Sequence, residues 1–207
     1  MPTHDRPEDS QRESRSLLKG LELRSKQDQE SGPGTAEGYA ILFNVETDIC
    51  GIWTEVIAPG AFTKSLQERD VIAIHSHDSG RIVGRRGAGT LELKEDSKGV
   101  SFVNPLPDTT DGRDLAVQID RGDIAGMSFG FVATRQEWDD NFDPPKRTIF
   151  EADLYEITYT AVPQYDKTEV GMRSLEHARA EKRDHNKTGA GQRIAKRMRL
   201  AQRQRKI

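Results

Sequence analysis

Three short segments of the chain carry residues of the types that take part in acyl transfer. The segment VIAIHSH contains His75 and His77, either of which could be the base, GMSFGFVA contains Ser128, and LYEITYTAV contains Glu156. A hydroxyl nucleophile, an imidazole base and a carboxylate that holds the imidazole in one tautomer are the parts of a serine hydrolase. These residue types predict a Ser–His–Glu site if the fold brings the three segments together.

The period of two along a strand gives each segment a polar side. In GMSFGFVA the bulky Met127 and Phe129 share one face, and Ser128 lies on the other, with Gly126 and Gly130 as its same-face neighbours. We interpret these glycines as leaving an open space that a substrate backbone needs. In VIAIHSH, continued alternation would point His75 and His77 to the same side.

The spacing of Ser128 and Glu156 predicts that they face each other across a hairpin. The loop from Asp139 to Pro145 is centred midway between them. An antiparallel hairpin about that loop would place Ser128 opposite or diagonal to Glu156, and diagonal neighbours lie about 7–8 Å apart. An imidazole from an adjacent strand fits such a gap. Ser, His and Glu also occur together on ordinary sheet surfaces, so that interpretation remains open.

Three other kinds of site are disfavoured. His75 and His77 resemble the start of a metal motif, but positions 79 and 80 are Ser79 and Gly80, so further ligands are missing and we expect no metal. Cys50 lies in an expected loop without a nearby base, and is predicted to be a small buried or half-buried residue. The glycines at 84, 87 and 89 precede alternating leucines and not a helix, which excludes a dinucleotide-binding loop.

The elements that must position these residues are mostly strands. Strand patterns cover 17–26, 39–43, 71–77, 127–138 and 147–162, and residues 90–103 form a hairpin pattern. Short helices are predicted around 62–66 and over 108–119, where cap residues precede an amphipathic stretch that Gly122 ends. Strands do not alternate regularly with helices, so we predict a mainly β (α+β) fold, an antiparallel barrel or sandwich with a few surrounding helices.

Composition sets the expected class of protein. The 207 residues are 34% hydrophobic and 31% charged, with one cysteine, which suits one domain with charged tails and excludes a disulfide scaffold. Apolar runs stay well below the ~18 residues of a membrane helix, and the first residues lack the apolar stretch of a signal peptide. We therefore expect a soluble intracellular protein without membrane contact.

Charge and composition divide the chain into three parts. Residues 1–16 are polar and predicted to be a disordered arm, 17–170 form the domain, and 171–207 form a basic tail. The tail carries a net charge of +9 and the rest −12. Ile194, Met198 and Ala201 form one stripe of a basic helix within it. A solvated helical tail is the simple interpretation, and contact with a partner protein or nucleic acid is the alternative.

Five segments in order resemble the prohead (procapsid maturation) serine proteases of tailed phages: GYAILFN, EVIAPGAFTKSL, SHDSGRIVGR, DGRDLAVQIDRGDIAGMSFGF and EADLYEITYTAVPQY. They span roughly residues 17–170. The resemblance implies an assemblin-like β-barrel related to herpesvirus maturation proteases. It implies Ser128 as nucleophile, His77 as base and Glu156 as the carboxylate, although the herpesvirus relatives use a second histidine as the third member. Ser76 stands where the family usually has Asn, Gln164 where it usually has Ala, and His75 where an apolar residue is common.

The resemblance also implies the protein's partners. The expected substrates are the scaffolding segment of the major capsid protein and the protease itself, cleaved inside the assembling procapsid in the host cytoplasm. No cofactor is expected, a homodimer is possible, and the tail beyond residue 170 is expected to be removable. Nucleic acid is an expected partner only through that tail. The oxyanion donors are expected to be backbone amides, with Arg113 as a weaker candidate. The alternative is a non-catalytic capsid scaffolding protein with the same barrel.

Overall fold

The structure is a computed structural model, and it describes residues 12–17, 24–26, 33–161, 172 and 175–183. The chain divides into two compact units between Thr168 and Glu169, two residues from the expected boundary. In the second unit the structure describes Met172 and a helix over 175–183. The predicted stripe of Ile194, Met198 and Ala201 lies outside the described residues.

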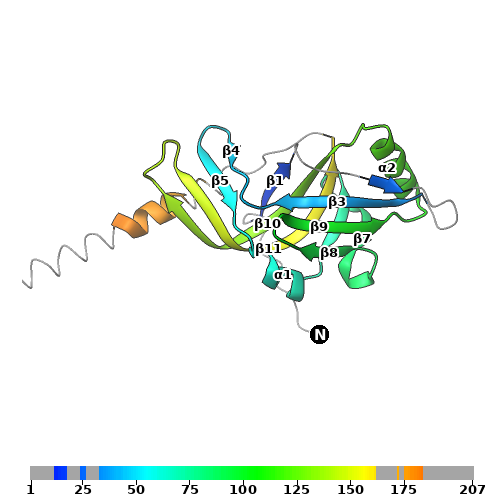
Figure 1. Ribbon diagram of the computed structural model, residues 1–207, viewed down its shortest axis with the longest axis horizontal. Coiled ribbons are helices and arrows are strands. Elements are labelled where there is room, and N and C mark those ends of the chain that lie inside the picture. The colour runs from blue at the N-terminus through cyan, green and yellow to red at the C-terminus, as the bar shows by residue number, and fades with distance from the viewer. Residues whose placement is uncertain (1–11, 18–23, 27–32, 162–171, 173–174, 184–207) are drawn as a thin grey trace, which may run out of the picture. The chain divides into compact units, whose positions relative to one another are not determined.

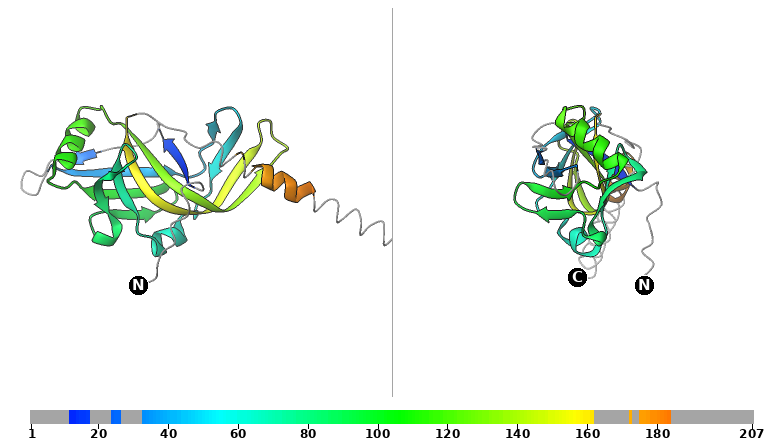
Figure 2. Two further views of the ribbon diagram at one scale, coloured as in Figure 1. Left: turned by 180° about the vertical axis from the view of Figure 1, so that it is seen from behind. Right: turned by 90° about the vertical axis from the view of Figure 1, so that its right-hand side faces the viewer.

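The first unit is mainly β, as predicted, and its strands form two sheets (Figure 1). The larger sheet contains β1 (Glu13–Leu17), β4 (Thr47–Ile49), β5 (Trp53–Ile57), β6 (Ile72–His75), β7 (Asp78–Arg85), β10 (Gly126–Asp139) and β11 (Lys146–Thr160). The smaller sheet contains β2 (Arg24–Lys26), β3 (Thr35–Leu42), β8 (Glu92–Glu95) and β9 (Gly99–Pro105). Helices α1 (Thr63–Glu68) and α2 (Thr110–Asp120) lie outside the sheets (Figure 2).

The pairing is not purely antiparallel. β5 and β6 both pair in parallel with β11, whereas the other pairings are antiparallel. Among the described strands, the ladders give two separate sheets and no closed ring. The prediction of a mainly β fold is therefore confirmed, and the sheets, expected to be mainly antiparallel, also contain these two parallel pairings. Both reach β11 after long connections, which a simple hairpin model of neighbouring strands does not anticipate.

Most elements predicted from local pattern are present. The hairpin of β8 and β9 pairs Leu93 with Phe102. Helix α2 begins after Thr109, whose hydroxyl accepts a hydrogen bond from the Gly112 amide at 3.2 Å, and it buries Leu115 and Ile119. This cap satisfies one of the amides that a helix leaves unpaired at its start. In the described residues, no helix is long and apolar enough to cross a membrane.

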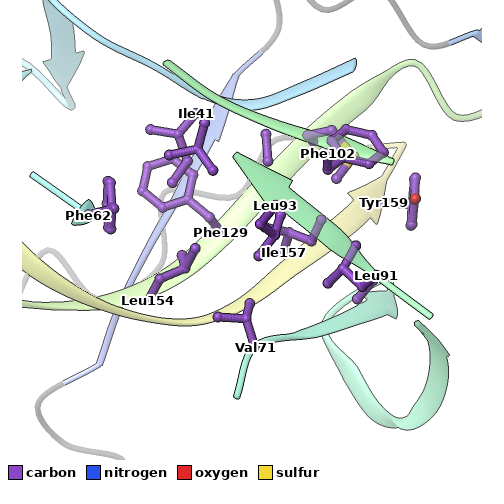
Figure 3. Packing of buried hydrophobic residues seen from close by; sticks show 14 of the residues in the cluster. Ile41, Phe62, Val71, Leu91, Leu93, Phe102, Phe129, Leu154, Ile157 and Tyr159 are labelled. Carbon is purple, nitrogen blue, oxygen red and sulfur yellow. The ribbon is translucent and has the colours of Figure 1, made fainter. Parts of the chain in front are cut away.

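The long hairpin of β10 and β11 supplies one wall of the core. Phe129 and Ile157 are paired across the hairpin, and their side chains pack with Ile41 and Leu93 of the smaller sheet (Figure 3). Phe62, beside α1, meets Phe129 edge-on at 6.2 Å between ring centroids. Because side chains alternate along a strand, burying Phe129 on this side places Ser128 on the opposite face.

Four residues assigned to the disordered arm lie in a strand. Glu13–Ser16 belong to β1, which pairs antiparallel with β10, while residues 1–11 lie outside the described residues. Glu13 and Arg15 are buried, with exposures of 3% and 4%. Composition missed this strand because charged residues are seldom buried unless they are paired, and the partners here are far away in sequence.

Candidate active site

Ser128 and Glu156 lie diagonal to each other on the hairpin of β10 and β11. The register pairs Ser128 with Thr158 and Gly130 with Glu156. The sequence argument left an opposite or a diagonal arrangement open, and the structure has the diagonal one. A register shift between Gly130 and Phe131 moves the pairing by one residue relative to a regular hairpin.

His77 is not part of a strand. β6 ends at His75, β7 begins at Asp78, and Ser76 and His77 form the two-residue turn between them. Both turn residues have positive φ, 54° and 57°, as in the hairpin turns that match strand twist. The expectation that alternation continues to His77 is therefore wrong, because a residue in a turn does not follow the period of the strand.

Thr158 anchors this turn. Its hydroxyl accepts a hydrogen bond from the His77 amide at 3.0 Å and donates one to the Ile74 carbonyl at 3.1 Å. Thr158 is fully buried and is the cross-strand partner of Ser128. The sequence analysis did not assign Thr158 a role. Its position two residues after Glu156, on the same face of the strand, is the signal that could have indicated one.

The imidazole of His77 contacts the carboxylate of Glu156. Nδ1 of His77 lies 3.1 Å from Oε1 of Glu156, and both side chains are partly buried, at 21% and 17% exposure. An ionised carboxylate only accepts hydrogen bonds, so Nδ1 must carry the proton that it donates. Nε2 is then the basic nitrogen, and it is buried without a hydrogen-bond partner. This is the tautomer that a general base requires.

Gly130 makes room for the carboxylate. A Cβ atom placed on Gly130 would come within 2.8 Å of Cγ of Glu156. The expected open space beside Ser128 is therefore filled, on the Gly130 side, by the Glu156 side chain and not by substrate. Only glycine at this position lets Glu156 lie across β10 toward the turn.

Strand β1 covers Ser128. Ser128 is fully buried, and its hydroxyl donates a hydrogen bond to the Arg15 carbonyl at 2.7 Å. Oγ of Ser14 lies 3.1 Å from Oγ of Ser128 and donates to it, because the proton of Ser128 is already committed. Within the described residues, no hydrogen bond joins Ser128 to His77. The hydroxyl therefore interacts with β1 in place of the imidazole.

A buried group of four charges attaches β1 to the rest of the sheet. Arg15 donates to Glu55 through Nε at 2.7 Å and Nη2 at 3.0 Å, and Arg147 donates to both carboxylate oxygens of Glu13 at 2.6 and 2.7 Å. Burial by itself raises the pKa of Glu55, but the charges and hydrogen bonds of Arg15 and Arg147 outweigh it and lower the pKa. The group links β1 to β5 and β11.

His75 occupies a different environment from His77. It is 3% exposed, and its Nδ1 is buried without a partner. Burial lowers the pKa of His75, and the charge of Arg81 adds to that effect. His75 is therefore neutral near pH 7, with no hydrogen bond to Ser128 or Glu156 among the described residues.

Other candidates of the sequence analysis are placed as follows. Cys50 is exposed, so the expectation of burial is wrong; it lies in the turn after β4 with a φ of 54°. Arg113 on α2 donates to Asp108 at 2.5 Å. In the ranges that the structure covers, no three His, Cys, Asp or Glu side chains are grouped to hold a metal ion.

A comparison with known families agrees with the geometry. A family model described as caudovirus prohead serine protease matches residues 19–183. No curated protein and no solved structure gives a match. The match includes Ser128, His77 and Glu156, and it extends past the segments that carried the resemblance. Since it covers most of the sequence, the chain belongs to the caudovirus prohead serine protease family.

Proposed function

We propose that this protein is a serine endopeptidase that cleaves the scaffolding segment of the major capsid protein, and its own chain, inside the assembling procapsid. The observation that carries the proposal is the contact of His77 Nδ1 with Glu156 at 3.1 Å, beside Ser128 on the same hairpin. Membership of the prohead protease family supports the substrate class.

The proposed mechanism is acyl transfer. Nε2 of His77 takes the proton of Ser128 as Oγ attacks a peptide carbonyl, and the proton then passes to the leaving amine. Water hydrolyses the acyl-enzyme by the same base. Glu156 holds the imidazole in place and stabilises its charged form. Backbone amides are the proposed donors to the oxyanion, a contribution worth about 3–4 kcal/mol in serine proteases.

Further parts of the proposal follow from the family resemblance. We propose that the two sheets correspond to the barrel of assemblin-like proteases, and that activity is low until assembly concentrates enzyme and substrate. Pairing of two copies and removal of the tail after residue 170 belong to the same hypothesis.

Coexpression with the cognate capsid protein tests the activity. New N-termini on the capsid protein, mapped by mass spectrometry, are expected with the unmodified chain. Ser128→Ala and His77→Ala are expected to lower cleavage by at least about 10³-fold, as for other residues of a catalytic unit. Ser79→Ala, at an exposed serine, and His75→Ala are the matched controls.

The outcomes separate the alternatives. Cleavage that survives in Ser128→Ala and His77→Ala contradicts the assigned site, and loss in His75→Ala but not in His77→Ala moves the base to His75. Absence of fragments with every variant, although capsids assemble, favours a non-catalytic scaffolding protein. A nucleic-acid role of the tail is tested separately, because such binding weakens steeply with added salt and depends on residues 171–207.

A further inference from the structure

Strand β1 lies where a peptide substrate of Ser128 would have to lie. Its five residues pair antiparallel with Met127–Phe131, and Ser16 is the partner of Ser128. β10 is bonded to β11 on its other side, and among the strands that the structure describes β1 is the one that pairs with this edge of β10. An exposed strand edge of this kind binds an extended peptide through main-chain hydrogen bonds, whatever the peptide's sequence.

The carbonyl nearest the nucleophile belongs to Arg15. Oγ of Ser128 donates its proton to this oxygen at 2.7 Å, so the hydroxyl lies against a peptide group of β1. The proton is given to the carbonyl oxygen and not to His77, whose Nε2 has no partner. β1 thus occupies the position next to Ser128 as a bound peptide would, but the Ser128 hydroxyl is not oriented to attack it.

Two buried side chains outside β1, those of Arg147 and Glu55, bind the charged side chains of β1. Arg147 binds Glu13 through both carboxylate oxygens, and Glu55 binds Arg15 through two nitrogens. Such two-point contacts impose both charge and orientation. With β1 removed, Arg147 would keep its contacts with Glu55 at 2.8 Å and Gln136 at 2.6 Å. The hydrogen bonds from Arg147 to Glu13 and from Arg15 to Glu55 would be lost. A replacing chain would therefore need an acidic residue followed, two positions later, by an arginine.

The opposite face of β1 carries small side chains. Ser14 contacts the hydroxyl of Ser128 at 3.1 Å, and Ser16 is the next residue on that face. Small residues here let the strand lie close over Ser128.

We propose that β1 is a substrate-mimicking strand, and that the β10 edge with Arg147 and Glu55 is the binding site for a capsid-protein segment of the pattern acidic–small–arginine–small. β1 inhibits the enzyme in cis, and a substrate segment must displace it. The inference rests on the proposed function, since it takes Ser128 as the nucleophile.

Labelling of Ser128 with a fluorophosphonate tests the inhibition in the full-length chain. Ser14→Pro, which removes an amide from β1, is expected to raise the labelling rate at least about tenfold, because a tethered strand competes at an effective concentration near millimolar. Glu13→Gln, which keeps the shape of the side chain but removes the charge that binds Arg147, is expected to raise it at least several-fold. Glu46→Gln is the matched control, since this exposed glutamate pairs with Lys146 on another strand. Equal rates in all four proteins overturn the inhibition.

Binding of a labelled peptide tests the recognition. The probe is fluorescein-labelled RESRSL, which repeats residues 12–17, measured by anisotropy on the full-length Ser14→Pro, Ser128→Ala chain. Peptides with the changes equivalent to Glu13→Gln and Arg15→Gln are expected to bind at least about tenfold more weakly, as expected for loss of one charge-assisted contact. Equal binding of the three peptides, or no binding, overturns the recognition.

The two readouts distinguish this inference from the proposed function. Charge-dependent peptide binding without labelling of Ser128 in any protein supports the strand site and contradicts the nucleophile. Equal labelling of Ser128 in all proteins, without peptide binding, supports Ser128 as the nucleophile and contradicts the strand site. If circular dichroism shows that both β1 variants fail to fold, hydrogen exchange of the unmodified chain tests whether β1 can be displaced. The amides of β1 are then expected to exchange at least about tenfold faster than those shared by β10 and β11, and equal protection contradicts a displaceable strand.

Discussion

At the scale of single residues, the two nitrogens of His77 have different surroundings. Nδ1 faces Glu156, and Nε2 is buried without a partner. Glu156→Gln is expected to lower the cleavage rate by about 10³–10⁴-fold, because an amide no longer enforces the tautomer that leaves Nε2 basic. The measurement is the rate of capsid-protein cleavage. Full activity of Glu156→Gln would show that His77 is oriented by other groups, such as Thr158.

His75 provides a prediction on stability against pH. Its folded pKa is lowered by burial and Arg81, whereas the unfolded chain has the usual value near ~6.5. As pH falls below that value, the unfolded state takes up the proton first, so the free energy of unfolding decreases by up to about 1.4 kcal/mol per pH unit. His75→Gln is expected to reduce this decrease between about pH 7 and 5.5.

Urea unfolding of the full chain at several pH values measures this effect. His177→Gln is the control, because the side chain of His177 is 75% exposed. The same change in acid sensitivity in both variants would contradict a specific contribution of His75.

At the scale of elements, the register of the β10–β11 hairpin sets the distance from Glu156 to the turn. Gly130→Ala is expected to displace the Glu156 side chain, since the added Cβ would lie 2.8 Å from its Cγ. A displacement of this size is expected to lower the cleavage rate by about 10²-fold. Adding Glu156→Asp, which shortens the side chain, is expected to restore part of the rate.

The control for this prediction compares the cleavage rate of Gly130→Ala with its thermal stability, each relative to the unmodified chain. Overpacking alone costs about 1–3 kcal/mol and is read from thermal unfolding. A rate loss that disappears once both proteins are assayed well below their unfolding temperatures would indicate a stability effect and not a displaced carboxylate.

A second prediction at the scale of elements concerns the turn between β6 and β7. Ser76 has a φ of 54°, a conformation that asparagine tolerates better than serine. Ser76→Asn is therefore expected to stabilise the fold by a few tenths of a kcal/mol, up to about 1 kcal/mol. Ser79→Asn, on β7, is the control. A lower unfolding midpoint for Ser76→Asn would mean that serine makes a favourable contact that asparagine cannot replace.

At the scale of the whole first unit, the buried charges of Glu13, Arg15, Glu55 and Arg147 connect three strands distant in sequence. Removing one partner of such a group leaves an uncompensated buried charge, which costs about 3–5 kcal/mol. Glu55→Gln is expected to lower the free energy of unfolding by that amount. The exposed Glu46→Gln is expected to cost at most about 1 kcal/mol. Equal losses in chemical denaturation would contradict the tight coupling of this group.

Local patterns in the sequence were sufficient for much of the fold. Apolar alternation around Phe129 and Ile157 predicted the long hairpin, and the cap residues at 108–111 predicted the start of helix α2, where the structure shows Thr109 as the cap. The position of the loop centre predicted that Ser128 and Glu156 would lie opposite or diagonal to each other on the hairpin, and they lie diagonal. These features depend on residues near each other along the chain, so propensity and spacing report them.

The remaining features depend on contacts between distant segments. His77 leaves the strand at a left-handed turn whose amide is bonded to Thr158, 81 positions away. The polar residues 13–16 become a buried strand because Glu55 and Arg147 neutralise their charges. The residue types of the proposed catalytic group could therefore be chosen from the sequence. Only the folded chain sets the orientation of the imidazole and covers Ser128 with β1. A charged or hydrogen-bonding group pairs with whichever group the fold brings within about 3 Å of it. The spacing of residues along the sequence does not show which group that is.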